Sequence, residues 1–208
     1  MEIIVDHYSK KLKGNMVLDD VSMKMSSGNI YGFMGTNGSG KTMLMRAVCG
    51  LITPTKGSVS IDGKVIGREI DFPESVGVLI EGPAFIGEMS AKENLMQLAS
   101  INKKIGEKEV DEILKEVGLG NTGKKRYHRF SLGMKQRLGI ACAVMEHPEL
   151  VILDEPFNAL DDEGVRMCAS LIRKQKEDGK LVIIACHDKE LIESLSDKIF
   201  KISEGKLV

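Results

Sequence analysis

Short apolar stretches alternate with amphipathic segments along most of the chain. Residues 29–34, 150–153 and 181–186 are apolar runs of strand length, and a segment with helical character follows each of them. Strands that are buried on both faces of a parallel sheet consist of continuous rather than alternating apolar residues. The pattern therefore predicts an α/β protein with a mostly parallel sheet that is covered by helices on both faces.

The N-terminal third of the chain has a different pattern. Residues 2–26 predict two or three strands with a polar turn over residues 11–15, and residues 58–66 predict a hairpin about Asp62-Gly63, a favoured two-residue turn. We expect these segments to form an N-terminal antiparallel β subdomain. A closing hairpin is expected about residues 204–205.

Residues 84–146 are predicted to be mainly helical. A capping box begins at Ser90, residues 110–117 carry apolar side chains at positions i, i+3, i+4 and i+7, and a third helix is expected from about residue 133 to residue 145. This segment would be an insertion into a core formed by residues 1–83 and 147–208. We therefore expect a single domain of 208 residues with an inserted α-helical subdomain.

Composition and charge narrow the class of protein. A hydrophobic fraction of 42%, a charged fraction of 28% and a net charge of −1 are ordinary, and they give no support for a general nucleic-acid binder. The N-terminus does not resemble a signal peptide, and no stretch reaches 18 consecutive apolar residues. We interpret the single cysteines Cys49, Cys142, Cys168 and Cys186 as buried side chains in a reducing compartment, which predicts a cytoplasmic protein.

The most informative stretch follows the first buried strand. Residues 35–42 match the P-loop pattern G-x-x-x-x-G-K-[ST], with a predicted strand before it and a predicted helix after it. Its glycines let backbone N–H groups turn toward a phosphate, and the helix adds its positive N-terminal end. Lys41 can reach the β- and γ-phosphates, and the Thr42 hydroxyl can bind Mg²⁺. The predicted nucleoside-triphosphate site consists of Gly35, Thr36, Asn37, Gly38, Ser39, Gly40, Lys41 and Thr42.

Polar side chains also follow two further predicted strands. Asp154 and Glu155 end one apolar run, and His187 follows another, so all three fall at the sheet edge where ligands bind. Asp154 is suited to hold Mg²⁺, and Glu155 is suited to orient or deprotonate an attacking water, which phosphoryl transfer requires. His187 could reach the γ-phosphate, although a lone histidine at a strand end is more often structural.

Five motifs occur in an order that resembles the ABC ATPases. Residues 130–137 resemble the signature motif of that family, the P-loop resembles its Walker A motif, and residues 150–155 resemble its Walker B motif. Residues 158–161 resemble the D-loop, and His187 is similar to the switch histidine. The resemblance covers the whole chain and implies a P-loop NTPase core, with ATP and Mg²⁺ as cofactors and ATP hydrolysis as the activity.

The family resemblance also implies partners. Two ATPase subunits would pair head to tail, with each nucleotide held between the P-loop of one subunit and Ser131, Gly133 and Asp161 of the other. A separate membrane permease would hold the chain at the inner face of the cell membrane. Residues 80–83 and 131–137 are similar to bacitracin-resistance and lantibiotic-immunity transporter ATPases, which implies export of peptide antibiotics or related molecules.

Several positions depart from the family pattern. Glu81 occupies the position of the usual Q-loop glutamine, where a carboxylate can still bind Mg²⁺ or sense the γ-phosphate. Leu132 and Met134 replace a glycine and a glutamine of the usual signature. Leu12 replaces the aromatic residue that stacks on adenine, whereas Tyr8 aligns with an apolar strand position. Weaker stacking predicts loose selectivity between ATP and GTP.

The alternative is a soluble ABC ATPase that acts on ribosomes or nucleic acid. Repair and cohesion members have long coiled coils before the signature, which are excluded because only 88 residues separate Thr42 from Ser131. Translation-factor members have two ATPase domains in one chain. The basic residues 124–129 are more often a solvated loop than a nucleic-acid site, so we expect no nucleic-acid partner.

Overall fold

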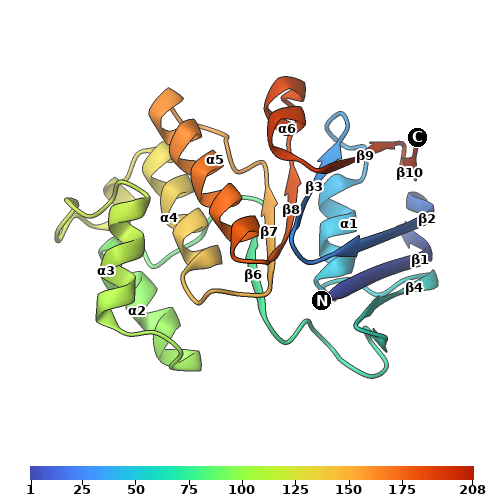
Figure 1. Cartoon of the computed structure of the whole chain (residues 1–208), viewed down its shortest axis with the longest axis horizontal. Helices are drawn as coiled ribbons and strands as arrows, with labels where there is room; N and C mark the ends of the chain where they lie inside the picture. Colours follow the sequence, from blue (N-terminus) through green and yellow to red (C-terminus); the bar gives the residue numbers. More distant parts are fainter.

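A six-stranded sheet forms the centre of the molecule in the computed structural model, which describes all 208 residues (Figure 1). Its strands are β3 (Asn29–Met34), β6 (Val76–Leu79), β7 (Leu150–Asp154), β8 (Leu181–Ala185), β9 (Lys198–Ser203) and β10 (Lys206–Leu207). They lie in the order β10-β9-β3-β8-β7-β6, and only β10 and β9 pair in the antiparallel sense. The predicted mostly parallel sheet is confirmed.

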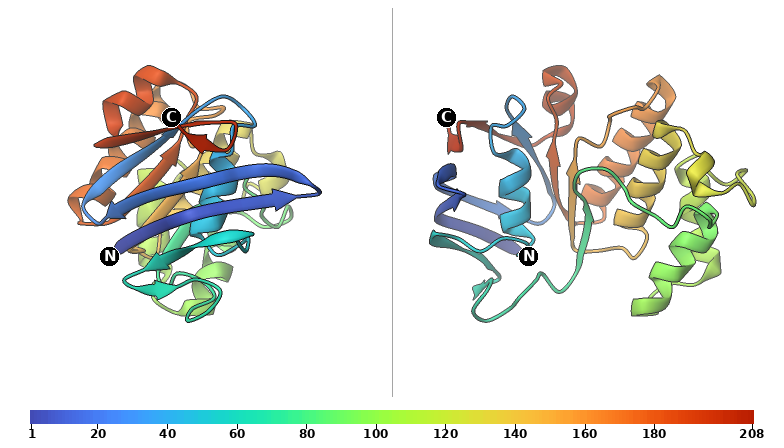
Figure 2. Two further views of the ribbon diagram at one scale, coloured as in Figure 1. Left: turned by 90° about the vertical axis from the view of Figure 1, so that its right-hand side faces the viewer. Right: turned by 180° about the vertical axis from the view of Figure 1, so that it is seen from behind.

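A second, antiparallel sheet lies against one side of this core, as Figure 2 shows. Its strands are β1 (Glu2–Leu12), β2 (Asn15–Ser26), β4 (Lys56–Ile61) and β5 (Lys64–Val65). Residues 2–26 form two strands rather than three. Strand β1 extends to Leu12 and β2 begins at Asn15, so only two residues remain of the turn predicted over residues 11–15. The turn is short because Lys13 and Gly14 both adopt positive φ angles, 48° and 87°, as Asp62 and Gly63 do in the next hairpin.

Six α-helices and one short 3₁₀ helix complete the fold. They are α1 (Lys41–Val48), α2 (Ala91–Asn102), α3 (Glu107–Glu116), a 3₁₀ turn (Tyr127–Arg129), α4 (Leu132–Val144), α5 (Asp162–Glu177) and α6 (Lys189–Leu195). The predicted capping box is present, because the Ser90 hydroxyl accepts from the Glu93 N–H and the Glu93 carboxylate accepts from the Ser90 N–H. None of these helices combines the length and the apolarity that a bilayer crossing needs.

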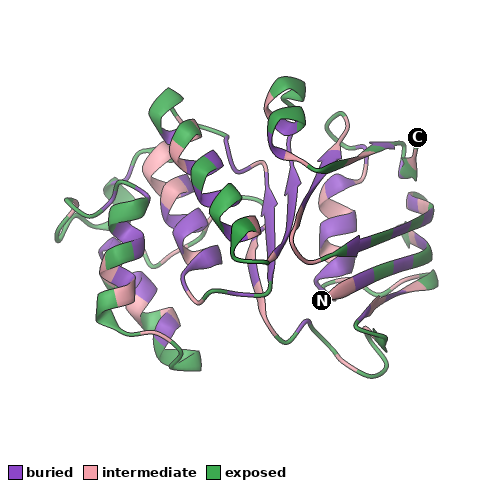
Figure 3. Cartoon of the chain, viewed as in Figure 1, coloured by how far each residue is buried: buried purple, intermediate pink, exposed green.

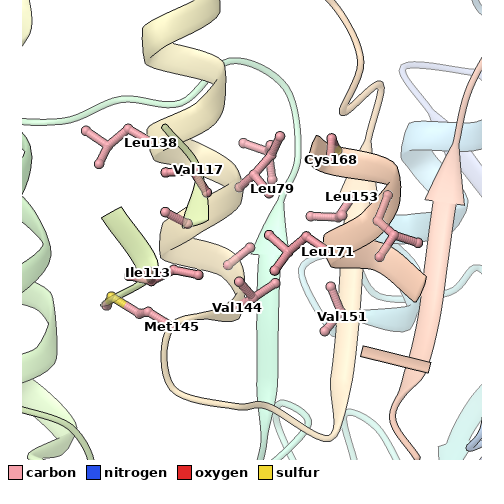
Figure 4. Close-up of a cluster of buried hydrophobic side chains, with 14 of the residues drawn as sticks. Leu79, Ile113, Val117, Leu138, Val144, Met145, Val151, Leu153, Cys168 and Leu171 are labelled. Carbon is pink, nitrogen blue, oxygen red and sulfur yellow. The ribbon is translucent and has the colours of Figure 1, made fainter. Parts of the chain in front are cut away.

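Two hydrophobic clusters lie on opposite faces of the six-stranded sheet. The first, here the helical-side cluster, joins the sheet to α2, α3, α4 and α5, and part of it is drawn in Figure 4. The second, the hairpin-side cluster, joins the sheet to α1 and the antiparallel strands. Strand β7 contributes Val151 and Leu153 to the first cluster and Leu150 and Ile152 to the second, so it is buried along its whole length (Figure 3).

The four cysteines are free. Cys49, Cys168 and Cys186 are buried, as the sequence predicts, whereas Cys142 is half-buried. Burial raises the pKa of the Cys49 and Cys168 thiols to about 12. Both therefore remain neutral thiols at physiological pH, which is typical of structural rather than reactive cysteines.

Candidate nucleotide-binding site

The P-loop connects β3 to α1 and is shaped by close contacts that only glycine permits. A Cβ atom on Gly35 would lie 2.2 Å from the Ile202 carbonyl oxygen and 2.5 Å from Ser39 Oγ. Gly40, at the N-terminus of α1, has a φ of 112°, which side chains with a Cβ rarely adopt. The backbone curl predicted for this stretch is therefore enforced by packing against β9.

Two polar side chains of the loop lack an anionic partner. Lys41 is only 6% exposed, and its ammonium group donates to the carbonyl oxygens of Gly35 at 2.7 Å and Thr36 at 3.1 Å. The hydroxyl of Ser39 is buried without any hydrogen-bond partner. A phosphate would bind the ammonium group more strongly than two neutral carbonyls do. The loop fits a polyphosphate.

Of the three residues predicted to hold Mg²⁺, Thr42 and Asp154 are in contact, whereas Glu81 pairs with another side chain. Thr42 Oγ1 donates to Asp154 Oδ2 at 2.6 Å, which links the start of α1 to the end of β7. Burial is the largest cause of a raised pKa at Asp154, and the charges of Glu155 and Glu81 add to it. A hydroxyl beside a buried carboxylate is an oxygen donor set that suits Mg²⁺. Glu81 is turned toward Arg46, whose guanidinium lies 2.5 Å from its carboxylate.

Glu155 and His187 meet at the ends of β7 and β8. His187 Nδ1 lies 2.8 Å from Glu155 Oε2, while Glu155 Oε1 is buried and unpaired. The backbone of Glu155 has a φ of 47° and is held at both ends, since its N–H donates to the Ala185 carbonyl and its own carbonyl accepts from Gln136. One carboxylate oxygen is thus oriented by an imidazole and the other is free to accept a proton.

Lys41, Thr42, Asp154 and Glu155 border a cavity of about 350 Å³, within the range of small-ligand sites, whereas Ser39 and His187 do not line it. It is lined by Met16, Val17, Asn37, Gly38, Gly40, Lys41, Thr42, Met43, Asp154, Glu155, Glu204 and Gly205. The turn at residues 204–205 is fixed to the P-loop because the Gly205 N–H donates to the Ser39 carbonyl at 2.8 Å.

The cavity wall differs from what the sequence suggests at the base-binding end. Leu12 ends β1 in an exposed position and does not line the cavity, whereas Met16 and Val17 at the start of β2 do. Tyr8 is buried, in line with its predicted apolar strand position. Met16, Val17 and Glu204 carry no motif in the sequence, and only the docking of two hairpins on the P-loop brings them to the site.

The signature residues lie outside this cavity. Ser131 is the exposed N-cap of α4, where its hydroxyl accepts from the Met134 N–H at 3.2 Å, and Leu132 is 73% exposed. A Cβ on Gly133 would lie 2.7 Å from the Ala159 carbonyl, so the predicted D-loop packs against the signature. Asp161 caps α5 and pairs with Arg137 at 2.7 Å, and these contacts lower the pKa of its carboxyl. Ser131, Gly133 and Asp161 therefore do not line the P-loop cavity, although the neighbouring Leu132 lines an adjoining cavity together with Asp154 and Glu155.

A family model described as ABC transporter matches residues 18–158. That span includes the P-loop, the signature residues and the carboxylates at the end of β7. The chain belongs to the ABC transporter family. Its place within that family is the ATP-binding subunit, as similar proteins show.

Three curated relatives match nearly the whole chain. It is 42% identical over 205 residues to the uncharacterized ABC transporter ATP-binding protein YybJ of Bacillus subtilis, and the match covers 99% of this chain and 94% of YybJ. It is 41% identical to the bacitracin transport ATP-binding protein BcrA of Bacillus licheniformis, over 92% of this chain and 63% of BcrA. It is 35% identical to the lantibiotic transport ATP-binding protein SrtF of Streptococcus pyogenes, over 98% and 88% respectively.

The fold also matches solved ATP-binding cassettes. One similar structure is that of the cassette MJ0796, described as a dimer in a post-hydrolysis state bound to ADP and Pi. The match has a TM-score of 0.86 at 25% identity and covers 99% of this chain and 96% of that one. The predicted P-loop NTPase fold is confirmed, and the chain is an ABC ATPase, a family that binds ATP and ADP.

Proposed function

We propose that two copies of this ATP-binding subunit pair head to tail and drive a separate membrane permease that exports peptide antibiotics or related molecules. The observation that carries this proposal is that the predicted signature contacts do not line the P-loop cavity. Ser131 and Gly133 lie outside the cavity that Lys41 and Thr42 line, so one chain alone would leave the outer side of a bound nucleotide open. A second copy would supply that side.

The chemistry would be divided among several residues of the site. Lys41 and the P-loop N–H groups would bind the phosphates, while Thr42 and Asp154 would hold Mg²⁺. A bound Mg²⁺ ion supplies positive charge for the phosphates. Glu155 would accept a proton from the attacking water through its unpaired oxygen, with His187 fixing the other oxygen. A single chain should therefore hydrolyse ATP slowly.

The dimer is tested with Glu155→Gln, which keeps the shape of the side chain but removes the base. We expect nucleotide binding to persist, turnover to fall about 10²-fold or more, and ATP to hold two chains together. Light scattering with saturating Mg·ATP should then show twice the 22.8 kDa mass of one chain. The same variant with Lys41→Ala should stay monomeric. If Glu155→Gln alone stays monomeric with bound ATP, the head-to-tail arrangement is wrong.

The loop after Glu81 presents an apolar side chain that could contact the permease. Phe85 packs edge-on against Tyr127 with ring centroids 5.3 Å apart, so it belongs to the core of the chain. Ile86 is 50% exposed, yet its backbone N–H and carbonyl are both hydrogen-bonded to the Asn94 side chain. A fixed, exposed apolar side chain is suited to a partner surface, and we propose that the permease covers Ile86.

The permease is tested by purifying the tagged chain from detergent-solubilised membranes of its own cell, followed by mass spectrometry. We expect a polytopic membrane protein at stoichiometric yield, which would place the chain at the inner membrane face. Ile86→Glu should reduce that yield severalfold because a charge would be buried at the interface, while ATP binding stays unchanged.

Co-purification of ribosomes or nucleic acid without a membrane protein would favour the alternative, a soluble ABC ATPase. The matches to BcrA and SrtF do not favour that alternative, because both are described as transport ATP-binding proteins. The proposed cargo class rests on the same two matches. The sequence of the co-purified permease would narrow it further.

A further inference from the structure

An ion pair joins the P-loop helix to the unusual carboxylate at position 81. Arg46 Nη2 lies 2.5 Å from Glu81 Oε1, and 33% of the Arg46 side chain is exposed. Arg46 follows Thr42 by four residues in α1, so the two side chains share one face of the helix. That face therefore contacts Asp154 through Thr42 and Glu81 through Arg46.

Three carboxylates converge at this side of the site. Glu81, Asp154 and Glu155 all line a second cavity, of about 460 Å³, next to the P-loop cavity, which Asp154 and Glu155 also line. The charge of Glu81 is one of the causes that raise the pKa of Asp154, so Glu81 lies within electrostatic reach of the proposed metal-binding carboxylate. An unpaired carboxylate here would repel the terminal phosphate, which is the group that distinguishes ATP from ADP.

The backbone at this position is constrained as well. Glu81 has a φ of 62°, in the left-handed region that residues with a Cβ seldom occupy. The bond to Arg46 is the only side-chain contact that fixes the direction of the Glu81 carboxylate.

We propose that Arg46 is a positioning residue of the ATPase site, which holds the Glu81 carboxylate and cancels its charge so that the site binds ATP well despite a carboxylate beside the phosphates. This inference rests on the proposed nucleotide site, with the terminal phosphate near Glu81. It predicts that the charge of Arg46 matters only while a carboxylate is present at position 81. The effects of substituting Arg46 and Glu81 should therefore depend on each other.

The test is a double-mutant cycle on the full chain with Arg46→Met, Glu81→Gln and both together. Isothermal titration measures the Kd of ADP and of a slowly hydrolysed ATP analogue with Mg²⁺ present. We expect Arg46→Met to weaken the analogue about fivefold or more but ADP less than about twofold, because an unpaired charge acts on the added phosphate. Glu81→Gln in the Arg46→Met background should restore the affinity for the analogue to within about twofold of Glu81→Gln alone.

Two outcomes would overturn the proposal. Equal weakening of both nucleotides by Arg46→Met, without rescue by Glu81→Gln, would mean that Arg46 only supports the helix. Unchanged affinities would mean that the pair is an exposed ion pair without function, as many are. Lys41→Ala should weaken both nucleotides in every background. Failure of the wild-type chain to bind either nucleotide would instead overturn the proposed site itself, and this inference with it.

Discussion

Asp154 is placed where function and stability conflict. The residue is 6% exposed, and its carboxylate accepts one hydrogen bond, from Thr42, in a region that also contains Glu155. Burial and the nearby negative charge both disfavour the ionised form, so the pKa of Asp154 is raised. In the proposed site Asp154 must be ionised to bind Mg²⁺, and the ionised form is the one that the fold disfavours. Active sites commonly carry such a conflict.

Asp154→Asn should therefore stabilise the nucleotide-free protein and remove the effect of Mg²⁺ on nucleotide binding. We expect the Tm at neutral pH to rise by about 2–4 °C, the response of a domain of this size to about 1 kcal/mol. Titration of an ATP analogue with and without Mg²⁺ should give similar Kd values for the variant. An exposed carboxylate elsewhere, changed by Asp71→Asn, provides the matched control.

The same substitution has a defined pH dependence. A folded-state pKa above the unfolded value means that protonating Asp154 favours the fold, so this stability is complete at acid pH and is lost as pH rises through the raised pKa. The gain in folding stability from Asp154→Asn should accordingly be largest at neutral pH and vanish below the ordinary pKa of an aspartate. An advantage that is constant across pH would show that packing, and not charge, is responsible.

The individual residues also show which parts of the candidate site can be predicted from the sequence. Lys41, Thr42 and Asp154 could be found because each occurs in a motif whose spacing reflects local geometry. Arg46 and Met16 could not, because their positions depend on loops that return from distant parts of the chain. A charge partner is found only when the tertiary structure places two side chains together.

At the scale of elements, local signals predict most helices and strands well. The apolar runs that became β7 and β8 are buried along their full length, and the capping box at Ser90 begins α2 where expected. The pairing of strands was harder to predict. Strand β1 pairs with β2 and β4 through several register shifts, at Tyr8 among other positions, and no local pattern specifies them.

Close packing between elements is also invisible in the pattern of apolar residues. Helix α4 approaches β6 so closely that a Cβ on Gly77 would lie 1.6 Å from the Ala143 carbonyl oxygen. From the same helix, Gly139 faces Leu79 and Pro83, each within 2.9 Å of a Cβ built there. Both glycines are needed for contact rather than for an unusual φ angle. Helix α4 of the helical segment thereby packs directly against the sheet.

At the scale of the whole molecule, the two hydrophobic clusters are joined through shared strands. Val182 and Ile184 of β8 face the helical-side cluster, while Leu181 and Ile183 face the hairpin-side cluster. Because the same strands supply side chains to both clusters, separating these strands would expose the side chains of both clusters to water. We therefore propose that residues 84–146 unfold together with the rest of the chain, as one domain.

Gly77→Ala tests whether the two parts unfold together, because the added methyl group would disrupt the contact between α4 and β6. We expect a loss of about 2–3 kcal/mol from overpacking, whereas Gly82→Ala, where a Cβ meets nothing, should change little. Pulsed thiol labelling in urea reports each cluster separately, since Cys168 lies in the helical-side cluster and Cys49 in the hairpin-side cluster. Both cysteines should become reactive at one midpoint, which shifts to lower urea in Gly77→Ala. If Cys168 reacts before Cys49, the helical-side cluster opens before the hairpin-side cluster, and the chain does not unfold as one domain.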